Sequence, residues 1–197
     1  MSAAPDKVAA VVIGASAGGV EALGALLAAL RPGCGVCVLI VVHLPRERPS
    51  LLSGLYASRC ALPIFEAVDK QAVEAGAVYF AAPDYHLLVD CHDDAPTLAL
   101  SVDAPVHYSR PSIDVLFESA AECWRERLMA VVLTGASEDG ARGMAAVARA
   151  GGITVVQDPA EALAPMLPTA ALRTGHAQRV LPLAGIRALF AELGDAP

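Results

Sequence analysis

Three side chains of the kinds found in hydrolytic sites follow apolar runs of this sequence. Ser16 follows the run VVIGA, His43 follows VCVLIVV, and Asp139 lies in the turn TGASEDG after LMAVV. A hydroxyl, an imidazole and a carboxylate can act together as a nucleophile, its general base and the acid that orients that base. The sequence therefore predicts acyl-transfer chemistry if the fold brings the ends of these runs together.

The turn around Ser16 has three interpretations. Residues 14–18 read GASAG and match the G-x-S-x-G nucleophile elbow, in which a sharp strand-to-helix turn exposes the serine hydroxyl. A glycine turn capped by a serine would explain the same letters. A phosphate cradle is disfavoured, because Ser16 occupies the second glycine position of G-x-G-x-x-G and His43 stands where a ribose-binding acid would be expected.

The imidazole and the acid also have alternatives. A histidine after a buried apolar run must be hydrogen-bonded, so His43 is either a satisfied structural residue or the base for Ser16. Asp139, Glu138 and Asp158 are the candidate acids, and Asp139 also suits an N-cap before a helix. The chain order Ser, His, Asp differs from the Ser, Asp, His order of α/β-hydrolases, which disfavours that fold.

The elements that must position these side chains alternate between strands and helices. Continuous apolar runs, typical of strands buried on both faces, occur at 8–14, 36–43, 63–68, 77–82, 128–135, 153–158 and 178–183. Helical patterns occupy 20–30, 49–60, 112–127, 140–150, 168–174 and 183–193. We predict an α/β fold: a doubly wound, mostly parallel sheet with helices on both faces and an edge β-hairpin over 86–102. In such sheets, loops at the carboxyl ends of the strands carry the site.

The composition limits the domain count and the partners. The 197 residues are 55% hydrophobic and 18% charged, which suits one well-buried domain, so we expect a single domain over 1–197. The net charge is −7 with 14 Lys and Arg, and binding phosphates needs clustered cations, so nucleic acid is disfavoured as a partner. No apolar run reaches the length of a membrane span, so we expect no membrane insertion.

The cysteines and the remaining histidines suggest no cofactor site. Five cysteines at irregular spacings, in a domain of this size, favour a reducing cytoplasm. Cys34 and Cys37 form a C-x-x-C pair that leads into a strand, so we interpret them as small buried residues, with a metal or redox role as the alternative. We expect no metal and no cofactor. The other histidines are interpreted as structural or surface residues: His86, His92, His107 and His176.

Seven segments of the chain together resemble the catalytic domain of CheB-type protein-glutamate methylesterases. The resemblance runs from about Val8 to about Leu183. It implies hydrolysis of glutamate methyl esters on chemoreceptor helices with release of methanol, often with deamidation of receptor glutamines. It assigns Ser16 as nucleophile, His43 as base and Asp139 as orienting acid. The segments, in order, are VVIGASAGGVEAL, VVHLP, VYFAAPDYHLLV, RPSIDVLFESAA, VVLTGASEDGARGM, GGITVVQDP and MLPTAAL.

The oxyanion and substrate groups are predicted less directly. Backbone N–H groups at Ala17 and in the turn of Ala136 would hold the oxyanion. Family members commonly have threonine at the Ala17 position, and many have methionine and glycine at Ala136 and Ser137. Arg46 and Arg48 could flank the site and meet acidic receptor helices, with a solvated loop as the alternative.

Regulation and partners follow from the same resemblance. Many members carry a receiver domain before the catalytic domain, whereas about seven residues precede the first strand here, so we expect a stand-alone esterase. Its expected partners are the cytoplasmic helices of methylated chemoreceptors and a chemosensory methyltransferase. Two alternatives remain: a catalytically weak signalling or scaffolding module of the same fold, and an esterase for small molecules.

Overall fold

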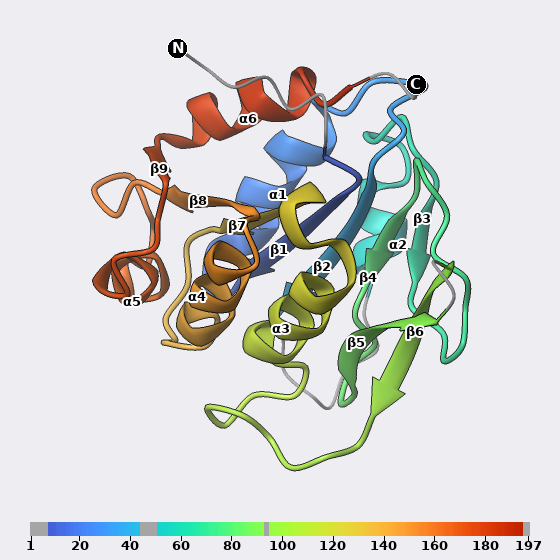
Figure 1. Ribbon diagram of the computed structural model, residues 1–197. Helices are drawn as coiled ribbons and strands as arrows, with labels where there is room; N and C mark the ends of the chain where they lie inside the picture. The colour runs from blue at the N-terminus through green and yellow to red at the C-terminus, as the bar shows by residue number, and fades with distance from the viewer. Residues whose placement is uncertain (1–7, 44–50, 93–94, 195–197) are drawn as a thin grey trace.

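A seven-stranded parallel sheet forms the centre of the molecule in a computed structural model that describes residues 8–43, 51–92 and 95–194 (Figure 1). The strand order is β3-β4-β2-β1-β7-β8-β9, and every neighbouring pair is parallel. All seven predicted strands are confirmed. Their bounds are β1 (Ala10–Ala15), β2 (Cys37–Val42), β3 (Ile64–Glu66), β4 (Val78–Phe80), β7 (Leu128–Val132), β8 (Ile153–Gln157) and β9 (Arg179–Leu181).

Helices cover both faces of the sheet, as predicted. Side chains alternate along β1, so that Val11 and Ile13 belong to the core cluster on the side of α1, α2 and α6, whereas Val12 belongs to the cluster on the side of α3, α4 and α5. Figure 1 is viewed from the side of α3 and α4, with α1 behind the sheet. Among the described helices none combines the length and the apolarity that crossing a bilayer requires. Their bounds are α1 (Gly19–Leu27), α2 (Leu52–Tyr56), α3 (Ile113–Trp124), the 3-10 helix η1 (Arg125–Arg127), α4 (Ala141–Arg149), α5 (Met166–Arg173) and α6 (Leu183–Ala191).

The predicted hairpin is present, but it is not part of the main sheet. Strands β5 (His86–His92) and β6 (Ala95–Ser101) pair antiparallel and form a sheet of their own, which corrects the prediction that they extend the edge of the main sheet. The physical reason is that the described backbone groups of the hairpin form hydrogen bonds with other segments and not with a strand of the main sheet. Val89 N donates to Ser119 Oγ of α3, and Leu98 exchanges two backbone hydrogen bonds with the segment 70–71. The hairpin is therefore fastened to α3.

The cysteines differ from the prediction of reduced thiols. Cys91 of β5 and Cys123 of α3 form a disulfide, with their Cα atoms 5.6 Å apart. The packing of β5 along α3 brings together these two positions, which lie 32 residues apart in the chain. Cys34 and Cys37 are buried, as interpreted, and neither is in a disulfide; burial raises the pKa of Cys37 to about 12.

Candidate active site

Ser16 and His43 occupy equivalent places at the ends of two neighbouring strands. The register pairs Ala15 of β1 with Val42 of β2, the residues immediately before them. His43 N donates to Ala15 O over 3.0 Å, which extends the ladder by one residue. Because paired strands lie about 4.8 Å apart, the hydroxyl-bearing and imidazole-bearing residues are neighbours at the carboxyl end of the sheet.

The turn that carries Ser16 is held by the end of β7. Ser16 N donates to Thr134 O over 3.0 Å, and Thr134 Oγ1 donates to Ala17 O over 2.9 Å. A Cβ atom at Gly135 would lie 2.8 Å from Ser16 Cβ, so only glycine leaves room for the serine there. Gly18 has φ +79°, a left-handed conformation that lets the chain turn into α1. These contacts fix the serine between the ends of β2 and β7.

His43 is hydrogen-bonded to Asp139. His43 Nε2 lies 2.9 Å from Asp139 Oδ2, the carboxylate is fully buried, and the imidazole is 12% exposed. An ionised carboxylate only accepts hydrogen bonds, so Nε2 carries the hydrogen and Nδ1 is the basic nitrogen. The described residues include no hydrogen bond between Ser16 Oγ and His43. The structure therefore joins the predicted base to the predicted acid.

The other two candidate acids have different surroundings. Glu138 is exposed, and Asp158 Oδ1 accepts a hydrogen bond from Ala160 N in its own loop. Neither carboxylate is hydrogen-bonded to His43, whose ring bonds to Asp139. Of the three candidates raised by the sequence, Asp139 is the one that the fold brings to the imidazole.

The N-terminus of α3 receives the Asp139 carboxylate. Oδ1 accepts from Ser112 Oγ over 2.8 Å and from Asp114 N over 3.1 Å, and Oδ2 accepts from Ile113 N over 2.6 Å. Burial alone raises the pKa of Asp139, but these hydrogen bonds and the one from His43 outweigh it and hold the pKa below its ordinary value. The positive end of the helix dipole also favours an anion here. Asp139 is thus a carboxylate kept ionised inside the protein.

Asp139 does not cap its own helix, which was its alternative role. The N-cap of α4 is Gly140, with φ +107° and no side-chain cap. The amides at the start of α4 are instead bound by Asp114, whose Oδ1 accepts from Gly140 N over 2.9 Å and from Gly143 N over 2.7 Å. Asp114 was missed by the sequence analysis, because its partner amides lie 26 to 29 residues away along the chain.

His86 supports the residue that binds Asp139. It is 1% exposed, its Nδ1 accepts from Ser112 N over 3.1 Å, and its Nε2 lies 3.2 Å from Ala104 O. The interpretation of His86 as a structural residue is consistent with these bonds. Ser112 is the N-cap of α3, and its Oγ accepts from Val115 N. Its bond to Asp139 was not predicted.

The predicted oxyanion donors lie in the turns after β1 and β7. Ala17 and Ala136 are both exposed, and within the described parts of the chain neither of their amides donates to another group. Ser137 Oγ accepts from Asp139 N over 3.1 Å. Serine at this position, where many family members have glycine, therefore stabilises the turn that carries Asp139. Arg46 and Arg48 lie outside the described residues.

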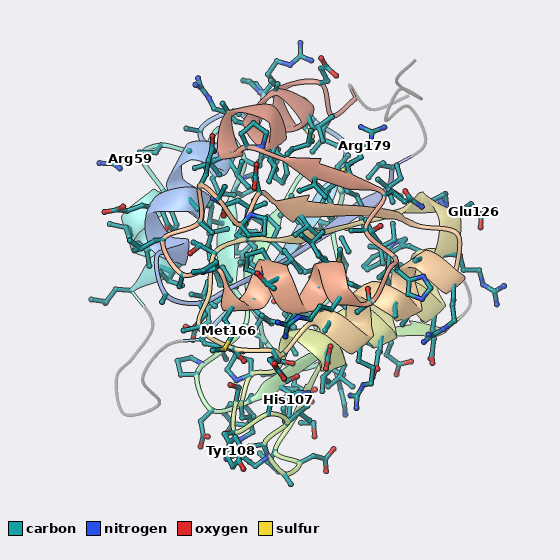
Figure 2. All side chains as sticks on the ribbon, turned by 90° about the vertical axis from the view of Figure 1, so that its left-hand side faces the viewer. Arg59, His107, Tyr108, Glu126, Met166 and Arg179 are labelled. Atoms are coloured by element: carbon teal, nitrogen blue, oxygen red, sulfur yellow. A yellow bond between two sulfur atoms is a disulfide. The ribbon has the colours of Figure 1, made fainter. Side chains whose placement is uncertain are left out.

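Exposed apolar side chains flank the serine turn. Leu163 is 77% exposed, and its Cβ lies 2.9 Å from where a Cβ at Gly18 would be, so it covers the turn after Ser16. Met166 begins α5 and is 53% exposed. Figure 2 shows Met166 and, below it on the loop before α3, Tyr108 and His107. Among the described residues no group of three or more His, Cys, Asp or Glu could hold a metal ion.

Residues 11–190, which carry all three candidate site residues, match the family model described as CheB methylesterase. The chain belongs to the CheB methylesterase family. This confirms the resemblance that the seven sequence segments indicate. The fold agrees, because the crystal structure of the Thermotoga maritima CheB methylesterase catalytic domain superposes with a TM-score of 0.89 at 29% identity, covering 95% of this chain and 99% of that one.

Curated relatives of this CheB-family chain differ in length. A relative from Leptospira interrogans is 39% identical over 184 residues, which cover 93% of this chain and 94% of the relative. A relative from Symbiobacterium thermophilum, named protein-glutamate methylesterase/protein-glutamine glutaminase, is 38% identical over 176 residues. The aligned part is 89% of this chain and 48% of that relative. The chain therefore spans nearly all of one relative and about half of the other.

Proposed function

We propose that this protein hydrolyses glutamate 5-O-methyl esters on chemoreceptors through Ser16, His43 and Asp139. The observation that carries the proposal is the 2.9 Å hydrogen bond from His43 to a buried, ionised carboxylate, one strand away from Ser16. Membership of the CheB methylesterase family and the names of relatives from Symbiobacterium thermophilum and Rhodospirillum centenum, both protein-glutamate methylesterase/protein-glutamine glutaminase, support the reaction class.

Acylation uses the tautomer that Asp139 selects. Ser16 Oγ attacks the ester carbonyl and passes its proton to His43 Nδ1, while Asp139 stabilises the imidazolium that forms. The N–H groups of Ala17 and Ala136 donate to the oxyanion of the tetrahedral intermediate. The intermediate collapses, the bond to the methoxy group breaks, and His43 returns its proton to the leaving oxygen, so that methanol departs.

Deacylation repeats these steps with water. His43 Nδ1 takes a proton from a water molecule, which attacks the Ser16 ester, and Ser16 Oγ leaves with that proton. The product is a free glutamate carboxylate. The same steps on a glutamine side chain would release ammonia and give the same product, which agrees with the second activity in the names of the relatives.

The substrate proposed here is a receptor helix that carries methylated glutamates, placed there by a methyltransferase. A receptor helix can approach Ser16 because Ala17 of its turn is exposed and the turn is flanked by the exposed Leu163. Apolar side chains at the rim suit the apolar positions of such a helix, while the ester carbonyl lies toward the Ala17 and Ala136 amides. Recognition therefore joins an apolar rim to a polar reacting centre.

Methanol release tests the proposal. Receptor methylated beforehand with labelled methyl groups is incubated with the wild-type chain, with Ser16→Ala, and with Ser101→Ala, which removes a surface hydroxyl hydrogen-bonded only locally to Asp103. Wild type and Ser101→Ala are expected to release methanol, and Ser16→Ala is not. Absence of release by wild type beside an active family esterase would favour the scaffolding module. Full activity of Ser16→Ala would refute the mechanism.

A further inference from the structure

We infer that Asp114 is a positioning residue for the catalytic acid, holding the Asp139 turn against the start of α3 from both sides. This rests on the proposed function, in which Asp139 orients His43. Asp114 is fully buried in the first turn of α3 and contacts neither the Ser16 turn nor the imidazole through a hydrogen bond of its own. Its action is therefore exerted through Asp139.

The backbone and the side chain of Asp114 bind different parts of the same turn. Its backbone N donates to Asp139 Oδ1 over 3.1 Å, and its side-chain Oδ1 accepts from Gly140 N, the next residue in the chain, over 2.9 Å. A third bond, from Gly143 N over 2.7 Å, ties the first turn of α4 to the same oxygen. Asp139 cannot move away from α3 without breaking bonds on both sides.

The second carboxylate oxygen of Asp114, Oδ2, lies near side chains of two further segments. Oδ2 is buried and has no hydrogen-bond partner among the described residues. Two nitrogen-bearing side chains approach it, His107 with Nε2 at 3.6 Å from the loop before α3, and Arg142 with Nε at 3.9 Å from α4. Asp114 thereby links that loop, α3 and α4 around the Asp139 turn.

Capping α4 is not the whole role of Asp114. Burial raises the pKa of Asp114, and the neighbouring charge of Asp139 raises it further, so an ionised group is disfavoured here. Asp114 binds Gly140 N, next to Asp139, as well as Gly143 N of α4, and its own backbone N binds Asp139 Oδ1. It therefore sets where the Asp139 turn lies in addition to capping α4.

Substitutions of Asp114 distinguish its hydrogen bonds to the amides of α4 from its charge. Asp114→Ala leaves the amides of Gly140 and Gly143 unpaired, and we expect kcat to fall about 10- to 100-fold with KM little changed, because substrate contacts stay intact. Asp114→Asn keeps an acceptor oxygen for both amides and should stay within about threefold of wild type. Asp114→Glu keeps the charge and changes the reach, so it should fall below Asp114→Asn, and it serves if Asp114→Ala does not fold.

The matched control is a destabilising substitution of a buried residue at the opposite end of the sheet from the Asp139 turn. Thr154 of β8 is fully buried and its Oγ1 binds His176 O and Gln178 N, beside the start of the strand rather than its carboxyl end. Thr154→Val removes these bonds and destabilises the fold without touching the Asp139 turn. A role of Asp114 in stability alone predicts that Thr154→Val and Asp114→Ala behave alike.

The closing experiment measures the rate at which a fluorophosphonate labels Ser16, together with methanol release and the ¹H shift of the His43 Nε2–H proton. The expected result is slow labelling and a moved proton shift in Asp114→Ala, with Thr154→Val and Asp114→Asn near wild type. Wild-type rates and shifts in both Asp114→Ala and Asp114→Glu would overturn the inference while leaving the proposed function standing. If wild type itself neither labels nor releases methanol, the proposed function fails, and the inference with it.

Discussion

Asp114 and Asp139 each bind the N-terminus of the other's helix. The Asp139 carboxylate accepts from amides at the start of α3, and the Asp114 carboxylate accepts from amides at the start of α4. Asp139, before α4, accepts from Ile113 N and Asp114 N of α3, and Asp114, in α3, accepts from Gly140 N and Gly143 N of α4. The pKa values of the two acids are nevertheless shifted in opposite directions. The pKa of Asp139 is lowered by its many donors, whereas the pKa of Asp114 is raised by burial.

The pH dependence of stability should therefore change in opposite directions in the two Asn variants. The ionised form of Asp139 stabilises the fold above the unfolded pKa of about 3.9, and that contribution is lost as the pH falls through its lowered pKa. Folding raises the pKa of Asp114, so stability is lost as the pH rises from the unfolded pKa of about 3.9 through this raised pKa. Relative to wild type, Asp139→Asn should lose stability between about pH 3 and about pH 7, and Asp114→Asn should gain it. Urea unfolding at both pH values measures this, and changes of the same sign would contradict it.

Removing the charge of Asp139 should impair catalysis far more than folding. Asp139→Asn can still accept from the amides of α3, but it does not stabilise the imidazolium of His43, so we expect kcat/KM to fall about 10³- to 10⁴-fold. The matched control is Glu138→Gln, which neutralises the adjacent, exposed carboxylate. Rates of methanol release decide the matter, and equal losses in the two variants would show that the Asp139 charge has no special role.

Ser16 should be sensitive to the size of its neighbour at 135. Gly135→Ala adds a Cβ 2.8 Å from Ser16 Cβ and 2.6 Å from Leu167 Cδ1, so the serine turn must shift. We expect the rate of serine labelling to fall about 10-fold or more, with a loss of about 1–3 kcal/mol in the free energy of unfolding. In Gly54→Ala the added methyl group meets nothing within 4 Å, and labelling should not change. Wild-type labelling of Gly135→Ala would refute the close packing.

The sequence predicted the elements whose signals are local. Each of the seven strands is a short apolar run, and a parallel sheet places the ends of such runs at one edge, so Ser16 and His43 could be put together from their positions alone. The carboxylate at 139 could be placed at the same edge, but its N-cap alternative could not be dismissed, because aspartate before a helix commonly caps that helix.

The surroundings of the acid could not be predicted, because they depend on contacts between distant segments. Ser112 and Asp114 meet the Asp139 turn across 25 to 29 residues, and His86 reaches Ser112 across 26. No spacing rule relates such positions, since the packing of α3 beside α4 decides them. The place of the hairpin was predicted wrongly for the same reason. Two short runs around a polar turn identify β5 and β6, whereas the hydrogen bonds that hold the hairpin come from Ser119 and the segment 70–71.

The Cys91–Cys123 disulfide should stabilise the fold only in oxidising buffer. It closes a loop across 32 residues of sequence and joins β5 to α3, two elements that also meet through the bond between Val89 N and Ser119 Oγ. Loop closure of this length is worth about 3 to 4 kcal/mol through the entropy of the unfolded chain. The double variant Cys91→Ser/Cys123→Ser should therefore be less stable than wild type by up to that amount without reductant and equal to it with dithiothreitol. Cys60→Ser, which alters an unbonded thiol, is the control and should show no redox-dependent difference from wild type. Guanidinium unfolding under both conditions gives the answer, and a double variant as stable as wild type in oxidising buffer would show that the bond contributes nothing to stability.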